Sequence, residues 1–117
     1  MRICKIFTLL LSINIFCSPL ELKDELGRRV KVPEKIEKII SLQPEITRII
    51  ISLGCGEKLV GNDYFMSKFD HIFYNVFPQG KKLPLVSISG SDLNLEFIIK
   101  LKPEIVFVSP TDSWMVD

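Results

Sequence analysis

We predict an α/β fold for this chain: a single Rossmann-like lobe with a short parallel sheet flanked by helices. Three observations predict it. Short apolar runs alternate with amphipathic runs, the connections between them are short, and proline or glycine stands at several boundaries. A length of 117 residues suits one modest domain, and a composition of 47% apolar and 25% charged residues is typical of a globular chain.

The expected strands begin with a small hairpin at 24–33 (DELGRRVKVP), in which Gly27 marks the turn and two valines alternate. Apolar runs predict three further strands, at 38–42, 58–61 and 83–88. The last strand, 105–109 (IVFVS), is apolar nearly throughout. We therefore expect it to be buried on both faces, as strands of parallel sheets are.

The first expected helix covers 45–53 (EITRIIISL). Pro44 suits its first turn, Glu45 complements the positive end of the helix dipole, and Gly54 is a natural C-terminal cap. Helical spacing predicts one apolar stripe facing the core, made of Ile46, Ile49, Ile50 and Leu53.

A second helix is expected at 95–101, stopped by Lys102 and Pro103. Its apolar stripe would turn Leu95, Ile98 and Ile99 inward and leave Glu96 facing out. The segment 62–82 has six aromatic residues and no clean period, so we expect a loop with one helical turn at most.

The N-terminus, residues 1–17, has the pattern of a secretory signal peptide, which leaves 18–117 as the folded domain. Arg2 and Lys5 precede an apolar run of eleven residues, too short for a membrane span of about 20. We expect export to the periplasm or cell envelope; the alternative is a buried first strand or helix. Cys17 is a candidate lipidation site, the one expected link to a membrane, although cleavage after it would remove it.

The composition excludes several functions. A net charge of +1 gives no electrostatic reason to expect nucleic-acid binding. His71 is the lone histidine and Cys55 the lone cysteine of the expected domain, so we expect neither a metal site nor a disulfide. Phosphate-binding glycine loops and nucleophile elbows are missing. We therefore expect no cofactor and no enzyme. The alternative is a small α/β enzyme that uses Asp63, Ser91 and Asp92.

Ligands of parallel sheets bind outside the carboxyl ends of the strands. Here those ends are the loops at 43–44, 62–65, 87–92 and 109–112. Tyr64 and Phe65 follow one strand end, and aromatic side chains at a loop mouth supply apolar contact area at small entropic cost. These loops therefore predict a binding surface.

Four motifs stand in order along residues 24–109: D-x-L-G-R-x-V-x-V-P, K-I-I-S-L-x-P-x-x-T, L-G-x-x-E-K-L-V-G and N-L-E-x-I-I-x-L-K-P-E-I-V. Together they resemble the N-terminal lobe of periplasmic substrate-binding proteins that serve ABC importers. The class is that of cobalamin, iron-siderophore and haem binders, with a helical backbone joining the lobes. The resemblance implies two α/β lobes linked by one long helix, with the ligand in the cleft between them.

The resemblance also implies residue roles. Glu96 would lie on the outer surface and dock onto arginines of the ABC permease. The ligand would be cobalamin, a ferric siderophore or haem; the aromatic loop favours cobalamin or haem, and the lack of basic residues in the loops disfavours strongly anionic siderophores. The residues implied to line the ligand cleft are Gln43, Pro44, Glu45, Tyr64, Phe65, Ser89 and Gly90.

Two departures from the family pattern are visible. Thr47-Arg48 stands where the family usually has Thr-Glu, and family members are more than twice as long. We therefore expect a truncated form: a fragment of a longer protein, a lone lobe with altered use, or a non-functional remnant. An isolated lobe should expose apolar surface and bind its ligand weakly or not at all.

Overall fold

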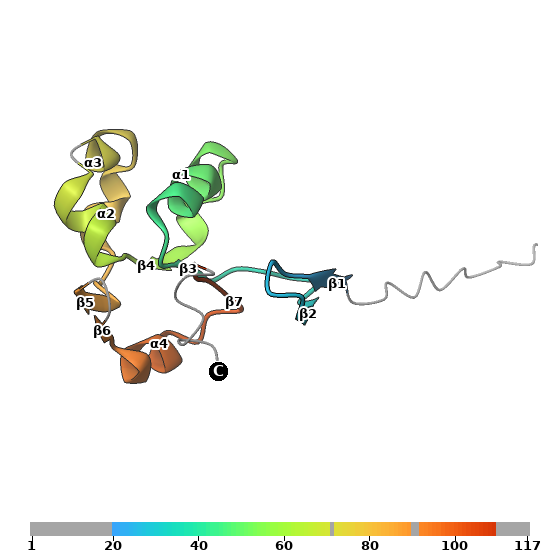
Figure 1. Ribbon diagram of the computed structural model, residues 1–117. Helices are drawn as coiled ribbons and strands as arrows, with labels where there is room; N and C mark the ends of the chain where they lie inside the picture. Colours follow the sequence, from blue (N-terminus) through green and yellow to red (C-terminus); the bar gives the residue numbers. More distant parts are fainter. Residues whose placement is uncertain (1–19, 71, 90–91, 110–117) are drawn as a thin grey trace, which may run out of the picture.

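The computed structural model describes residues 20–70, 72–89 and 92–109 (Figure 1). The predicted signal peptide with Cys17, the lone His71, and the predicted site residues Gly90 and Ser91 lie outside these ranges.

A parallel sheet organises the described part of the chain, as predicted. Its strands are β3 (Ile39–Ser41), β4 (Leu59–Gly61) and β7 (Ile105–Phe107), in the order β4-β3-β7. Both neighbours run parallel to β3, which is central and buried along its whole length. Parallel strands need crossover connections, and the helices α1 (Pro44–Ser52) and α4 (Leu95–Leu101) lie in these crossovers.

The predicted hairpin is present. Strands β1 (Leu20–Lys23) and β2 (Arg29–Val32) pair antiparallel, and Gly27 has a φ of +80°, which favours glycine. The turn is closed by Asp24, whose carboxylate accepts bonds from the Arg28 amide at 2.8 Å and from Arg28 Nε at 2.7 Å. The hairpin lies to one side of the parallel sheet (Figure 1).

Helix α1 (Pro44–Ser52) starts and stops as predicted, with proline in its first turn and Gly54 at a φ of +76°. Its predicted inward stripe is partly wrong. Ile50 is buried, but Ile49 and Leu53 are exposed, and Thr47 is buried in their place. Thr47 is accommodated because its hydroxyl donates to the Gln43 carbonyl at 3.0 Å, so no polar group is left unpaired.

The prediction of a loop at 62–82 is wrong. The segment forms α2 (Tyr64–Phe69), α3 (Phe73–Val76) and the 3₁₀ helix η2 (Pro78–Lys82). Asp63 caps α2 by accepting from the Met66 amide, and Asp70, which lies shortly before α3, accepts from the amides of Ile72 and Phe73. Each helix is too short for a period to be visible in the sequence.

The predicted strand at 83–88 is also altered. Only β5 (Ser87–Ser89) is a strand there, and it pairs antiparallel with β6 (Asp92–Leu93). A single parallel bridge between Asn62 and Leu85 ties this region to the end of β4.

Helix α4 (Leu95–Leu101) has the predicted limits. It is capped by the Asn94 side chain and ends at Lys102, whose φ is +51°. Its predicted inward stripe is wrong at two of three positions, because Ile98 is buried whereas Leu95 and Ile99 are exposed. The inner face is completed by Phe97 and Leu101. The helix is rotated relative to the prediction, and Glu96 is exposed as expected.

The prediction that the last strand is buried on both faces is wrong for β7. Val106 is 40% exposed. The reason is its place in the sheet: β7 is an edge strand of the described sheet, and Val106 belongs to neither apolar cluster of the described core.

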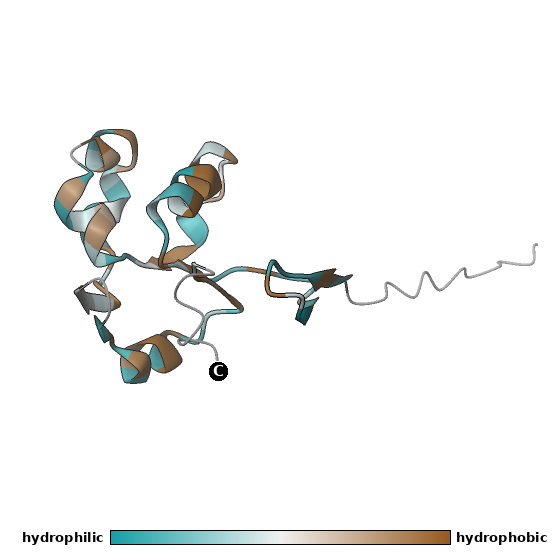
Figure 2. Ribbon diagram, viewed as in Figure 1, coloured by the Kyte–Doolittle hydropathy of each residue, from teal (hydrophilic) through white to brown (hydrophobic). Residues whose placement is uncertain are grey.

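The core lies on both faces of the sheet because neighbouring residues of β3 point in opposite directions. Ile39 joins a cluster under α1, α2 and α3, whereas Ile40 joins a smaller one with Val86 and Ile98 of α4. Figure 1 shows the same division, with α1–α3 on one side and α4 on the other. Brown and teal alternate around these helices in Figure 2, as expected when one face packs inward. In the described residues, no helix has the length and apolar character that crossing a membrane requires.

Candidate ligand-binding surface

The candidate surface lies at the carboxyl edge of the parallel sheet. Helices α1 and α2 both begin there, the first after Gln43 at the end of β3 and the second after Asp63 at the end of β4. Gln43 and Pro44 are half-buried, and Glu45 is exposed in the first turn of α1. Two of the four loops that sequence reasoning selected, at 43–44 and 62–65, are therefore neighbours in the structure.

Three aromatic side chains of α2, which we call the aromatic trio, gather at this edge: Tyr64, Phe65 and Phe69. Their ring centroids are 5.9 Å apart for Tyr64–Phe65, 6.2 Å for Tyr64–Phe69 and 5.9 Å for Phe65–Phe69. Phe65 is 46% exposed and Phe69 is 64% exposed. Rings that contact one another and still face solvent offer a preformed apolar surface to a ligand.

Asp63 lies beneath the trio and is only 2% exposed. Its Oδ1 accepts a bond from the Met66 amide at 2.9 Å, while its buried Oδ2 has no hydrogen-bond partner of good geometry in the described part of the chain. Burial raises the pKa of this carboxyl group, and the charge of Glu45 raises it further, against the backbone N–H groups of Met66 and Phe65, which lower it.

Met66 is the one fully buried residue of α2, so apolar burial anchors the helix at a single position. Short polar contacts also hold α2 in place. The Ser87 hydroxyl accepts a bond from the Tyr64 amide at 2.8 Å, which ties the start of α2 to β5. On the inner side, Tyr74 links Asn62 at 3.4 Å and Ser67 at 3.3 Å. These hydrogen bonds therefore connect α2, which carries the trio, to α3 and to the end of β4.

A cavity of about 500 Å³ lies at the same edge, beyond Gln43. Gln43 and Ile46 form one side of it, the hairpin turn another, and the end of β7 from Phe107 to Ser109 a third. Gln43 therefore faces open space, as a ligand-contacting residue requires.

The structure brings together most of the predicted cleft residues but not all of them. Gln43, Pro44, Glu45, Tyr64 and Phe65 share the carboxyl edge of the sheet. Ser89 is the last residue of β5, and Ser87 in the same strand contacts α2. The backbone of Ser89 therefore lies near this edge.

Glu96 lies apart from these residues, on α4 and the other face of the sheet. A shallow cavity beside it is lined by Asn94, Phe97 and Lys100. The separation agrees with an outer-surface role rather than with ligand contact.

Sequence reasoning missed Phe69; Asp63 and Ser87 fall inside the loops selected at 62–65 and 87–92, but they were not singled out as ligand-surface residues. Phe69 stands five positions after Tyr64, and it reaches the trio only because the segment is helical. The sequence signals for Asp63 were its place in the loop at 62–65 and its type, since aspartate is a preferred N-cap residue.

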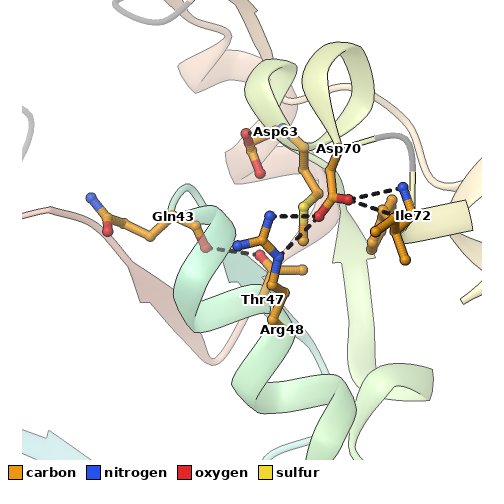
Figure 3. Close-up of polar contacts among 8 residues, drawn as sticks. Gln43, Thr47, Arg48, Asp63, Asp70 and Ile72 are labelled. Carbon is orange, nitrogen blue, oxygen red and sulfur yellow. Dashed lines mark hydrogen bonds and ion pairs between the residues drawn. The ribbon is translucent and has the colours of Figure 1, made fainter. Parts of the chain in front are cut away.

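Arg48 explains one departure from the family pattern. Its guanidinium contacts Asp70 Oδ2 through Nε at 3.0 Å and Nη2 at 2.8 Å, and so links α1 to the start of α3 (Figure 3). These bonds hold the pKa of Asp70 below its usual range. Arginine in place of glutamate here therefore has a partner within the lobe.

The alternative enzyme site gains no support from the geometry. Asp63 is committed to capping α2, and Asp92 is exposed on the short strand β6. Within the described ranges, no group of three or more histidine, cysteine and acidic residues is arranged to hold a metal ion.

No known family profile matches the sequence, but individual proteins do. The ABC transporter substrate-binding lipoprotein YvrC of Bacillus subtilis strain 168 is 30% identical over 91 residues, which are 75% of this chain and 25% of YvrC. The molybdate-binding protein MolA of Haemophilus influenzae is 25% identical over 87 residues, 74% of this chain and 24% of MolA.

Solved structures share the fold. A periplasmic solute-binding protein from Veillonella parvula superposes with a TM-score of 0.72 at 22% identity, over 84% of this chain and 31% of that one. MolA bound to molybdate gives 0.68 at 22% identity, over 83% and 31%. The haem-binding protein HmuT gives 0.62 at 23% identity, over 85% and 31%.

The chain spans about a quarter of the length of the curated relatives it matches. All the relatives named here are binding proteins rather than enzymes, which agrees with the prediction that this chain is not an enzyme. In sequence the chain is therefore similar to part of the ABC-transporter substrate-binding proteins, and in fold it is similar to part of the periplasmic solute-binding proteins.

Proposed function

We propose that this chain belongs to the substrate-binding component of an ABC importer, which captures a ligand outside the cytoplasm and delivers it to a membrane permease. The observation that carries the proposal is the exposed aromatic trio at the carboxyl edge of a parallel sheet, beside the loop of Gln43. The similarity to YvrC and MolA supports it. Gln43, Pro44, Glu45, Tyr64, Phe65, Ser89 and Gly90 are the proposed ligand-contacting residues.

The proposed ligand is cobalamin, haem or a ferric siderophore. A large ligand with apolar faces matches the trio, whose rings present an apolar surface wider than one side chain. HmuT binds haem and MolA binds molybdate, so the fold serves both kinds of ligand. The trio favours the first kind.

Export is part of the same proposal. Residues 1–17 would direct the chain across the membrane, and Cys17 is the proposed lipidation site. The names of the relatives, which describe a lipoprotein and periplasmic binding proteins, support both steps.

Glu96 is the proposed contact to the permease, because its carboxylate is exposed on α4, away from the ligand surface. In cells that import through this protein, Glu96→Ala should reduce uptake several-fold while ligand affinity stays unchanged. Glu57→Ala, which removes another exposed carboxylate of the lobe, is the matched control. Unchanged uptake by the Glu96 variant would contradict the permease contact and leave Glu96 with one role, that of a first-turn carboxylate that complements the dipole of α4.

The second candidate is a non-functional fragment of such a protein, and the exposed apolar residues favour it. Leu95, Ile99 and Val106 are among the large apolar side chains in contact with solvent.

Titration of the 117-residue chain tests the proposal. We expect cyanocobalamin or haemin to bind with a Kd weaker than about 1 µM, because one lobe offers only part of a cleft. Phe65→Ala should weaken this binding about tenfold, since ring stacking on an aromatic side chain is worth roughly 1–3 kcal/mol. Leu53→Ala removes another exposed apolar side chain, at the C-cap of α1 and away from the trio, and should change nothing. Equal loss in both variants, or no binding of any probe at millimolar concentration, would contradict the proposal.

A further inference from the structure

A groove between α1 and α3 takes no part in the surface proposed to bind ligand. Its cavity of about 320 Å³ has the size of pockets that hold small molecules. Ile51 of α1 lines one side, and Ile72, Phe73 and Val76 at α3 line the other. The groove is therefore apolar along most of its length, and it lies between two helices that pack on the same face of the sheet.

The rim of this groove exposes apolar side chains to solvent. Ile72 is 68% exposed and Val76 is 67% exposed, whereas Phe73 is 3% exposed and forms the floor. The Val76 amide donates to the Ile72 carbonyl at 3.2 Å, so the two side chains lie one helical turn apart on the same side of α3. A single exposed apolar residue needs no explanation, but two beside a cavity offer a continuous apolar contact to a ligand.

The polar end of the groove presents hydrogen-bond donors. Figure 3 shows Arg48 extended from α1 to Asp70, with Ile72 beside the same carboxylate. Asp70 Oδ2 accepts from Nε and Nη2 of Arg48 at 3.0 and 2.8 Å. Asp70 Oδ1 accepts from the amides of Ile72 and Phe73 at 3.1 and 3.0 Å, so both oxygens are engaged.

The ion pair is neutral as a whole, but its exposed side is the guanidinium. The side chain of Arg48 is 56% exposed, whereas that of Asp70 is 11% exposed. A guanidinium also has more N–H groups than the two that bind Asp70. Among the described residues that line the groove, the charged group within reach of a ligand is therefore that of Arg48.

We propose that this groove is a second binding site, specific for small amphiphilic carboxylates. The apolar chain of such a ligand lies against Ile72, Phe73 and Val76, and its carboxylate accepts from the N–H groups of Arg48 that Asp70 leaves unused. Guanidinium and carboxylate form charge-assisted hydrogen bonds, which are stronger than neutral ones. An alcohol of the same length gains the apolar contacts alone. The site uses none of the residues of the aromatic trio, so it does not depend on the proposed function.

Calorimetric titration of the 117-residue chain with octanoate and octanol tests the site. We expect octanoate to bind with a Kd below about 1 mM and octanol to bind several-fold more weakly. Arg48→Gln should weaken octanoate about fivefold and leave octanol unchanged. Val76→Ser should weaken both about threefold, because it removes apolar contact only. Arg29→Gln, which removes another exposed, ion-paired arginine from the hairpin, is the matched control and should change neither.

Both altered side chains are exposed, so the variants should fold, which circular dichroism checks. Arg48→Lys keeps the charge without the planar donor set, and its octanoate affinity should fall between those of the native chain and Arg48→Gln. Equal affinity of the native chain for octanoate and octanol would overturn the inference, as would equal octanoate binding by Arg48→Gln and Arg29→Gln. So would a chain that binds vesicles of phosphatidylglycerol but no octanoate at millimolar concentration, because the groove would then be a membrane contact.

Discussion

Gly61→Ala is expected to lower the free energy of unfolding by about 1–3 kcal/mol, as overpacking of a core does. Gly61 ends β4, where an added methyl group would lie 2.5 Å from Val86 Cγ1 and 3.5 Å from Ile40 Cγ1. Val86 and Ile40 are fully buried, so neither can turn out of the way. The glycine is required by close packing, because its φ is not in the left-handed region.

Urea unfolding of three variants checks this explanation. Val86→Ala alone should also destabilise, because it opens a cavity in the cluster of Ile40 and Ile98. The double variant should be more stable than the sum of the two single effects predicts, since the alanine at 61 fills space that the smaller residue at 86 leaves. Strict additivity would show that the close contact between 61 and 86 is not the cause.

The order of elements could be predicted from the sequence because local signals agree with one another. Pro44 and Gly54 bound α1, Pro103 follows α4, and a glycine turn closes the hairpin. Alternation of strands and helices with short connections then leaves few arrangements other than a parallel sheet. Such signals depend on the backbone conformation of a few neighbouring residues. They can therefore be recognised in the sequence without knowledge of the tertiary contacts.

The inward faces of the helices could not be predicted in the same way. In α1 and α4, apolar residues occupy two adjacent faces of the helix. Residue type alone therefore cannot decide whether Ile49 or Ile50, or Ile98 or Ile99, faces the core. What distinguishes them is the position of the sheet beneath. Thr47 can be buried there because its hydroxyl donates to the carbonyl of Gln43, four residues earlier. A stripe chosen by hydrophobicity alone would never include a threonine.

The candidate surface was predictable only in outline. The rule that ligands bind at the carboxyl ends of parallel strands selected the loops of Gln43 and Tyr64, and the structure brings these loops together. The contribution of Phe69 depends on α2, a helix of six residues that would not be stable alone. Its stability comes from Asp63, Ser87 and the burial of Met66, which are tertiary features.

Ile40→Ala is expected to cost about 2–5 kcal/mol, whereas Ile49→Ala should cost less than about 0.5 kcal/mol. Ile40 lies in the central strand, fully buried between Val86 and Ile98, and truncation leaves a cavity that β3 cannot close. Ile49 is 56% exposed on α1, although its spacing alone assigned it to the core.

The two variants delete the same atoms from a buried and an exposed site; alanine also favours a helix and disfavours a strand, which adds to the expected difference. A small domain has few kcal/mol to lose, so Ile40→Ala could abolish cooperative unfolding altogether. Ile40→Val, expected to cost about 0.5–1.5 kcal/mol, then gives a measurable step in urea. Similar losses at 40 and 49 would mean that α1 turns its predicted stripe to the sheet after all. The aromatic trio would then also lose its place, because α1 and α2 pack on the same face of the sheet and share one apolar cluster.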